Sequence, residues 1–154
     1  MNSTNFLEHQ GRGLQRVAVS LLLFTSFWGF AFPHLASPHL GLSVHTLCSL
    51  LASLLLGLGL TWRRLVLSAA TSRLAYWLLL YSGLAIVAAF MLGAIWGAGN
   101  ETMPLAAGSA HGNAFQEAVI KVVAYSSAPT GIVSFALVLW GLRGATEGTA
   151  LSEK

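Results

Sequence analysis

Charged residues are scarce in this chain: only 8% of its 154 residues are Asp, Glu, Lys or Arg. A soluble domain usually carries about a quarter. Hydrophobic residues make up 55%, and the mean hydropathy is +0.70. These values exclude an ordinary soluble domain and indicate an integral membrane protein. The net charge of +3 does not indicate a nucleic-acid partner, because the basic residues lie almost wholly at the ends of apolar runs.

Cysteine is nearly absent as well, since Cys48 is the only one. A single cysteine excludes a disulfide within the chain. Cys48 falls inside an apolar run, so we expect a free, buried thiol. The chain also has no CxxCH motif, which excludes that form of covalent haem attachment.

Four long apolar runs dominate the chain, at residues 14–33, 42–62, 74–98 and 118–142. A helix needs about 20 residues to cross ~30 Å of hydrocarbon, and each run is near this length. The runs are continuously apolar rather than alternating, which argues against a β-barrel. We therefore predict an all-α integral membrane protein, a single bundle of four transmembrane helices over residues 1–154, with a polar tail at 143–154.

The arginines gather at one predicted end of this bundle. They lie just before or at the start of the first run, around the connection between the second and third runs, and after the fourth run (Arg12, Arg16, Arg63, Arg64, Arg73 and Arg143). The connections at residues 34–41 and 99–116 contain neither Lys nor Arg. The positive-inside rule then predicts that the N- and C-termini are cytoplasmic. Trp62, Trp96 and Trp140 lie near run ends, where tryptophans anchor helices at the interface.

Ionisable groups inside or beside a membrane span are candidates for function. Glu117 and Lys121 are four residues apart at the start of the fourth run, so they can meet on one helix face. A self-neutralising ion pair is the simpler interpretation of these two residues. Pro129, further along the same run, is expected to kink the helix; the kink either shapes a pocket or is merely tolerated.

His45 is the histidine placed deepest in an apolar run, about one turn into the second. Ser49, Ser53 and Gly57 follow it at helical spacing and leave a strip of small residues. Close packing of helices explains such strips in general, and residues 85, 89, 93 and 97 form a similar one. The alternative is a flat macrocycle lying against the strip, with His45 as the axial ligand of its iron.

Several segments resemble bacterial (hydroxyamino)benzene mutase. They are residues 37–45 (SPHLGLSVH), 62–68 (WRRLVLS), 77–81 (WLLLY), 96–99 (WGAG), 103–108 (MPLAAG), 115–118 (FQEA) and 138–142 (VLWGL). The resemblance covers about residues 35–143. In helix count and in the place of the histidine, the chain is more distantly similar to styrene oxide isomerase.

The resemblance implies a small four-helix enzyme of the bacterial inner membrane, assembled as a homo-oligomer, a trimer as in styrene oxide isomerase, with haem b between subunits. It implies that His45 is the metal ligand, and that Ser49 and Ser53 belong to the cofactor-binding strip. The family pattern has an asparagine where this chain has Leu51, and another where it has Ile86 or a neighbour. The substrate contacts are therefore expected to differ.

The implied reaction is an intramolecular hydroxyl transfer that turns (hydroxyamino)benzene into 2-aminophenol, with the haem iron as a Lewis acid. The expected partners are a small aromatic substrate and membrane lipid, with no nucleic acid. Glu117 is the candidate for removing the ring proton. The candidates for the aromatic wall around the substrate are Tyr81, Phe90, Trp96 and Tyr125.

Two other classes of function remain open from the residues. A non-catalytic haem-binding subunit of a membrane complex explains His45 and the small-residue strip without a pocket. A small-molecule transporter has this size, but a proton-coupled carrier usually needs a carboxylate at mid-membrane. Every carboxylate of this chain lies outside the runs or at an end.

The predicted orientation can be tested by labelling single cysteines in a Cys48→Ser background. A cysteine in the 99–116 connection is expected to react with an impermeant thiol reagent applied from outside the inner membrane. A cysteine beside Glu147 is expected to stay unlabelled until the membrane is broken. The reverse pattern would place the arginine-rich end outside.

Overall fold

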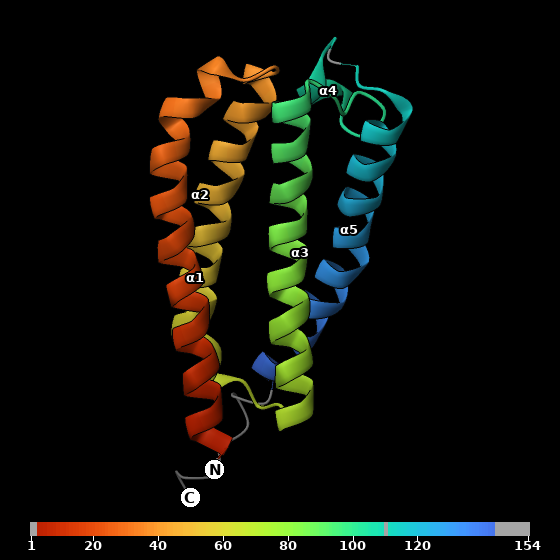
Figure 1. The fold of residues 1–154 in the computed structure, drawn as a ribbon. Helices are drawn as coiled ribbons and strands as arrows, with labels where there is room; N and C mark the ends of the chain where they lie inside the picture. The colour runs from red at the N-terminus through yellow and green to blue at the C-terminus, as the bar shows by residue number, and fades with distance from the viewer. Residues whose placement is uncertain (1–2, 110, 144–154) are drawn as a thin grey trace, which may run out of the picture.

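The computed structural model describes residues 3–109 and 111–143 (Figure 1). Its long helices are α1 (Ser3–Ala31), α2 (Pro38–Thr61), α3 (Ala69–Trp96) and α5 (Ala114–Arg143). Short helical segments lie between them: η1 (Phe32–His34), η2 (Trp62–Arg64) and α4 (Pro104–Ala107). The four long helices are long and apolar enough to cross a membrane. The predicted all-α fold with four helices able to span a membrane is thereby confirmed, whereas the tail after residue 143 lies outside the described residues.

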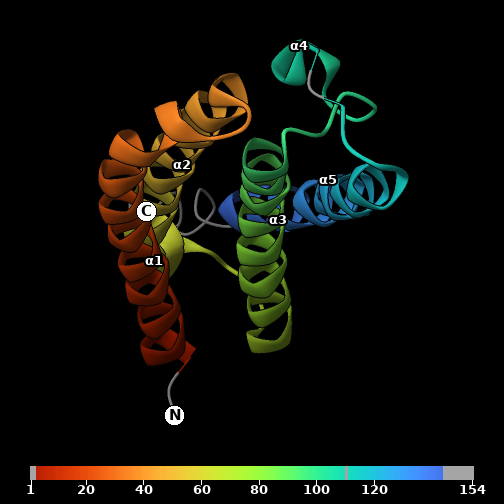
Figure 2. The ribbon, with the colours of Figure 1, turned by 45° about the horizontal axis from the view of Figure 1, so that its top comes forward.

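The long helices form two antiparallel pairs, α1 with α2 and α3 with α5 (Figures 1 and 2). The start of α1, the connection from α2 to α3 and the end of α5 lie at one end of the bundle. The segment η1 and helix α4 lie at the opposite end. The arginines of the described residues therefore lie in the half of the bundle at this end, with Arg16 the deepest of them; we call it the arginine end.

Each long helix begins before its apolar run, because hydropathy marks only the part that crosses lipid while hydrogen bonding continues past it; α1, α2 and α3 end one or two residues before their runs do. Helix α2 begins at Pro38, where a proline at the first position costs no hydrogen bond. His45 therefore lies two turns into α2, rather than one. Helix α3 begins after Ser68, whose side chain accepts a hydrogen bond from the Thr71 amide, and ends at Gly97, which has a left-handed φ of 64°.

A buried glutamine ties three elements together at the arginine end. The Gln10 Oε1 atom accepts a hydrogen bond from Trp62 Nε1 at 3.1 Å and another from Ser72 Oγ at 2.5 Å. These contacts join α1, η2 and α3. Trp62 is fully buried, so the prediction that it anchors the protein at the membrane interface is wrong. Trp140 does expose most of its side chain, as an interfacial residue does.

Small residues bring the helices close together. A Cβ atom added to Gly59 would lie 2.8 Å from the Gly11 carbonyl oxygen, so α1 and α2 touch through their backbones. A Cβ atom added to Gly93 would lie 2.9 Å from the Ala98 carbonyl oxygen and 3.1 Å from Leu40. The small-residue strip of α3 therefore serves packing.

Cys48 is buried and free, as predicted. Helix α5 runs without interruption through Pro129. Hydroxyl groups beside the proline supply local hydrogen bonds, since Thr130 Oγ1 donates to the Ser126 and Ser127 carbonyl oxygens at 3.0 and 2.9 Å.

Candidate functional site

His45 is held against α1 by Thr25, a residue that the sequence analysis missed. The His45 Nδ1 atom lies 3.1 Å from the Thr25 carbonyl oxygen and 3.1 Å from Thr25 Oγ1. The Thr25 hydroxyl also donates to the His45 carbonyl oxygen at 3.0 Å. Phe32 and Gly29 stand beside the imidazole, with ring centroids 6.2 Å apart for Phe32 and His45. The orientation of the imidazole is thus set by contacts with α1 and η1.

These contacts favour one tautomer of the imidazole. A carbonyl oxygen only accepts hydrogen bonds, so the contact with Thr25 places the proton on Nδ1. The Nε2 atom then carries a lone pair, and no described residue makes a hydrogen bond to it. Histidines that bind metals commonly donate their other N–H group to a backbone carbonyl in this way. The geometry is therefore that of a histidine prepared to act as a ligand through Nε2.

The strip below His45 faces out of the bundle. Ser53 and Gly57 are exposed, and a Cβ atom added to Gly57 would meet nothing within 4 Å. The hydroxyl groups of Ser49 and Ser53 donate to carbonyl oxygens four residues earlier, at 3.0 and 2.9 Å. These serines therefore present a smooth surface, and their donor protons are already used by the helix.

A site built from several protein ligands is not seen around His45. In residues 3–109 and 111–143, no three His, Cys, Asp or Glu side chains come together in a way that could hold a metal ion. A group that needs one axial ligand and a flat apolar surface matches what His45 and its strip provide.

The four aromatic candidates do not converge in the isolated chain. The Tyr81 hydroxyl lies 2.8 Å from Ser126 Oγ, and Tyr81 and Tyr125 are both exposed on the α3–α5 pair. Trp96 packs against the cluster of Ala89, Ala98 and Ile120. Phe90 packs against two core clusters, one containing Val44 and Cys48 and the other containing Leu40. Phe90 is therefore the candidate that reaches toward the helix carrying His45.

Glu117 anchors the connection between α3 and α5. Its side chain is only 4% exposed. Its Oε1 atom accepts hydrogen bonds from the Gly99 amide at 2.8 Å and the Gly112 amide at 3.0 Å, and Oε2 accepts one from the Glu101 amide at 3.4 Å. These bonds satisfy three backbone donors of the connection. Its role in catalysis stays a prediction.

The predicted ion pair between Glu117 and Lys121 is wrong. Lys121 Nζ lies 3.9 Å from Glu101 Oε2 instead, and both of these side chains are exposed. The reason lies in the tertiary structure. The folded connection brings backbone amides to Glu117, and these bind its buried carboxylate, whereas the Lys121 side chain is exposed.

Leu51 occupies the contact between α2 and α3, where the family pattern has an asparagine. A Cβ atom added to Gly83 of α3 would lie 2.7 Å from Leu51 Cδ1. Ile86 lies one turn further along α3 and is half-buried. Two apolar side chains thus stand where the pattern expects amides, so no amide is offered to a substrate at these two positions.

Comparison with known proteins places these observations in a family. Residues 10–143 match the family described as styrene oxide isomerase. Similar proteins include hydroxylaminobenzene mutase HabB from Ectopseudomonas oleovorans, which is 38% identical over 87% of this chain and 82% of its own length. Hydroxylaminobenzene mutase HabA from the same organism is 30% identical over 79% of this chain and 90% of its own length. No solved structure matches the chain.

The anchoring role of Glu117 predicts the effect of Glu117→Gln. A glutamine keeps one acceptor oxygen but turns an NH₂ group toward the backbone amides, leaving buried donors unpaired. We expect a loss of about 1–3 kcal/mol in stability and faster hydrogen exchange at the Gly99 and Gly112 amides. Thermal denaturation and hydrogen exchange measure the two effects.

Glu101→Gln is the matched control, because it makes the same change at an exposed carboxylate of the same connection. It is expected to shift stability by less than about 0.5 kcal/mol. If both variants behave alike, Glu117 does not anchor the connection.

Proposed function

Because this chain belongs to the styrene oxide isomerase family and is an isomerase, we propose that it converts (hydroxyamino)benzene into 2-aminophenol within the membrane. The observation that carries the proposal is the 38% identity with hydroxylaminobenzene mutase HabB over 87% of this chain. The match to the family, over residues 10–143, includes Thr25 of α1 and the parts of α2, α3 and α5 that carry the other candidate site residues.

The proposed reaction is balanced without a co-substrate. The N–O bond of the hydroxylamine breaks, and the oxygen forms a new bond to the ortho carbon of the ring. Loss of the proton from that carbon restores aromaticity, and the nitrogen gains a proton to become the amine. Since the product is an isomer of the substrate, neither an oxidant nor a reductant is consumed.

We further propose that His45 holds haem b through Nε2. The support is the contact of Nδ1 with the Thr25 carbonyl oxygen, which leaves the Nε2 lone pair available, together with the flat outward strip of Ser49, Ser53 and Gly57. When bound, the haem iron would supply a Lewis acid for the hydroxylamine oxygen. Thr25 would act as a positioning residue, since it fixes the direction in which Nε2 points.

The remaining residues would bind the ring and exclude water. His45 lies within a span, so its surroundings are apolar and bulk water is scarce there. Phe90 packs against the core cluster that contains Val44 and Cys48, which flank His45 in the sequence. Tyr81, Trp96 and Tyr125 would complete the wall, and Glu117 remains the candidate for removing the ring proton.

Because the strip of His45 faces outward, we propose that the site is completed by another copy of the chain. The family resemblance implies a homotrimer in a bacterial inner membrane, and the positive-inside rule predicts that both termini are cytoplasmic. Tyr81 and Tyr125 are exposed in the single chain and are available to contact a cofactor or substrate held by a neighbour.

The haem proposal predicts the spectrum of the purified protein. Wild type is expected to show a Soret band, and His45→Ala is expected to lose it while keeping its helical circular dichroism. His39→Ala, an exposed histidine in the first turn of the same helix, is the control and is expected to keep the band. Thr25→Val is expected to keep the fold but to bind haem about tenfold more weakly, because it loses the hydroxyl contacts with His45.

A colourless wild type, prepared with ample haem, would contradict the haem proposal. Turnover of (hydroxyamino)benzene by the isolated protein separates an enzyme from a non-catalytic haem subunit, and the haem band separates both from a transporter.

The isomerisation predicts the fate of the oxygen atom. In water labelled with heavy oxygen, and without added reductant or nicotinamide, the 2-aminophenol is expected to carry almost no label. The reason is that an apolar site keeps bulk water from attacking the ring. Mass spectrometry of the product measures the label. Substantial incorporation would mean that water adds to the ring, and the intramolecular transfer would have to be abandoned.

A further inference from the structure

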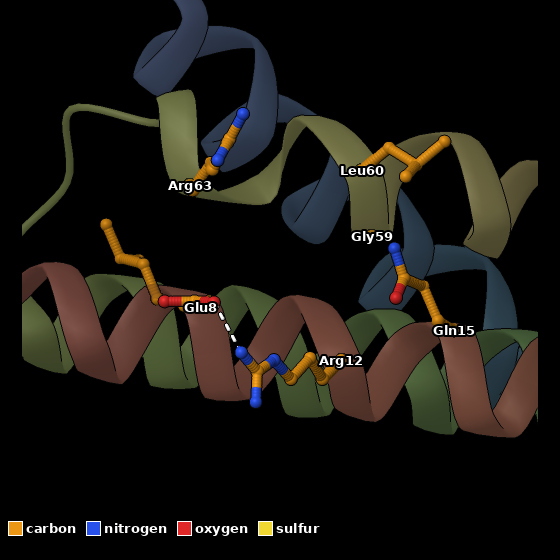
Figure 3. Close-up of a pocket in the computed structure, with 7 residues that line it drawn as sticks. Glu8, Arg12, Gln15, Gly59, Leu60 and Arg63 are labelled. Atoms are coloured by element: carbon orange, nitrogen blue, oxygen red, sulfur yellow. Dashed lines mark hydrogen bonds and ion pairs between the residues drawn. The ribbon is translucent and has the colours of Figure 1, made fainter.

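A cavity of about 280 Å³ lies between α1 and the end of α2 at the arginine end (Figure 3). Arg12 and Gln15 line it from α1, and Gly59 and Arg63 line it from α2 and η2. The contact between Gly11 and Gly59 forms its narrow side, because the two backbones touch there. The cavity is therefore a notch between two helices, with guanidinium groups from both.

The notch continues along α1 toward the middle of the bundle. A second cavity, of about 490 Å³, shares Arg12 and Gln15 with the first and adds Arg16 and Val19. Arg12, Arg16 and Val19 are spaced four and three residues apart, so they follow one face of α1. The two cavities form one trough that begins polar and becomes apolar.

The trough carries an excess of positive charge. Arg12 Nη2 donates to Glu8 Oε1 at 2.6 Å, so its charge is partly balanced. Arg16 and Arg63 have no carboxylate partner in residues 3–109 and 111–143, and both are exposed. At the arginine end the described residues hold six arginines and one carboxylate, Glu8. A negatively charged ligand would therefore be attracted to the trough.

The same face of α1 becomes an apolar stripe beyond Arg16. Val19, Leu23 and Phe27 follow at helical spacing and are 58%, 60% and 67% exposed. These side chains belong to a membrane span, so the stripe borders the hydrocarbon. A ligand that fits both parts has an anionic head beside Arg16 and Arg63 and a hydrocarbon chain along Val19, Leu23 and Phe27.

We propose that this trough binds one anionic glycerophospholipid per chain, with its phosphate held by Arg16, Arg63 and Arg12 and one acyl chain on the stripe of α1. A site that depended on positive charge alone would bind free phosphate as well as a lipid. The continuous change from guanidinium groups to exposed apolar side chains favours a lipid, because it matches the order of groups in a phospholipid lying in a leaflet. The site lies at the opposite end of α2 from His45, so it is separate from the proposed haem site.

Native mass spectrometry of the full-length protein, released from detergent, tests the proposal. Phosphatidylglycerol and phosphatidylcholine with the same acyl chains are titrated separately. Phosphatidylglycerol is expected to bind tightly with one lipid per chain, and phosphatidylcholine about tenfold more weakly. In the variant R16Q/R63Q the phosphatidylglycerol affinity is expected to fall about 25-fold, since each arginine near a membrane surface contributes about fivefold. R16K/R63K is expected to keep most of the affinity.

Arg64→Gln is the matched control, because it removes the same charge from the residue next to Arg63 but does not line the trough. It is expected to change the affinity less than about twofold. An equal loss in Arg64→Gln would mean diffuse attraction rather than a site, and equal binding of phosphatidylcholine would mean an apolar groove only. Loss of bound phosphatidylglycerol in millimolar inorganic phosphate would mean that the trough binds a free anion rather than a lipid. Each of these three results would overturn the proposal.

Discussion

The absence of water from the membrane interior is the constraint on which this structure depends. Every backbone and side-chain polar group within a span must find a partner inside the protein. Thr46, Ser49 and Ser53 meet this need locally, since each hydroxyl donates to the carbonyl oxygen four residues earlier. Among the buried side-chain atoms of the described residues, only Thr102 Oγ1 lacks a partner, and it lies in the connection after α3 rather than in a long helix.

The polar groups that are not satisfied locally join separate helices, and these bonds set how the helices align. Gln10 joins α1 to η2 and α3, and Thr25 joins α1 to α2. Ser134 Oγ donates to the Ala75 carbonyl oxygen at 3.0 Å and joins α5 to α3. Lipid is as apolar as leucine, so burial alone does not choose one alignment over another in a bilayer. The few polar contacts, together with the close approach of glycines, supply that choice.

The same contacts prepare the candidate site. A histidine in a span needs a partner for its N–H group, and the Thr25 carbonyl oxygen provides one. The other ring nitrogen is thereby left with its lone pair, on a helix face that the chain itself does not cover. One contact thus satisfies the N–H group of His45 and leaves Nε2 available for the ligand role that we propose.

The fold was largely predictable from the sequence, and the candidate site only in part. Apolar runs of sufficient length indicate four spans, and the burial of Cys48 follows from its place in one of them. Position in a run also distinguishes His45 from the histidines of the connections. The contact between Thr25 and His45 was not predictable, because the two residues are 20 positions apart and meet only when α1 and α2 align. The interfacial role expected of Trp62 fails for the same kind of reason, since Gln10 draws its indole into the bundle.

What the sequence by itself determined is the set of properties that depend on composition over a helix length. These are the number of spans, their approximate limits, the arginine end and the place of His45 within a span. Hydropathy is a sum over neighbours in the chain, so it can be read without knowing the packing. The tertiary structure alone decided which atoms meet: Glu117 binds backbone amides and not Lys121, and Nδ1 of His45 contacts Thr25 while Nε2 stays available. Hydrogen bonds act over about 3 Å, and only the packing of one helix against another brings groups within that distance.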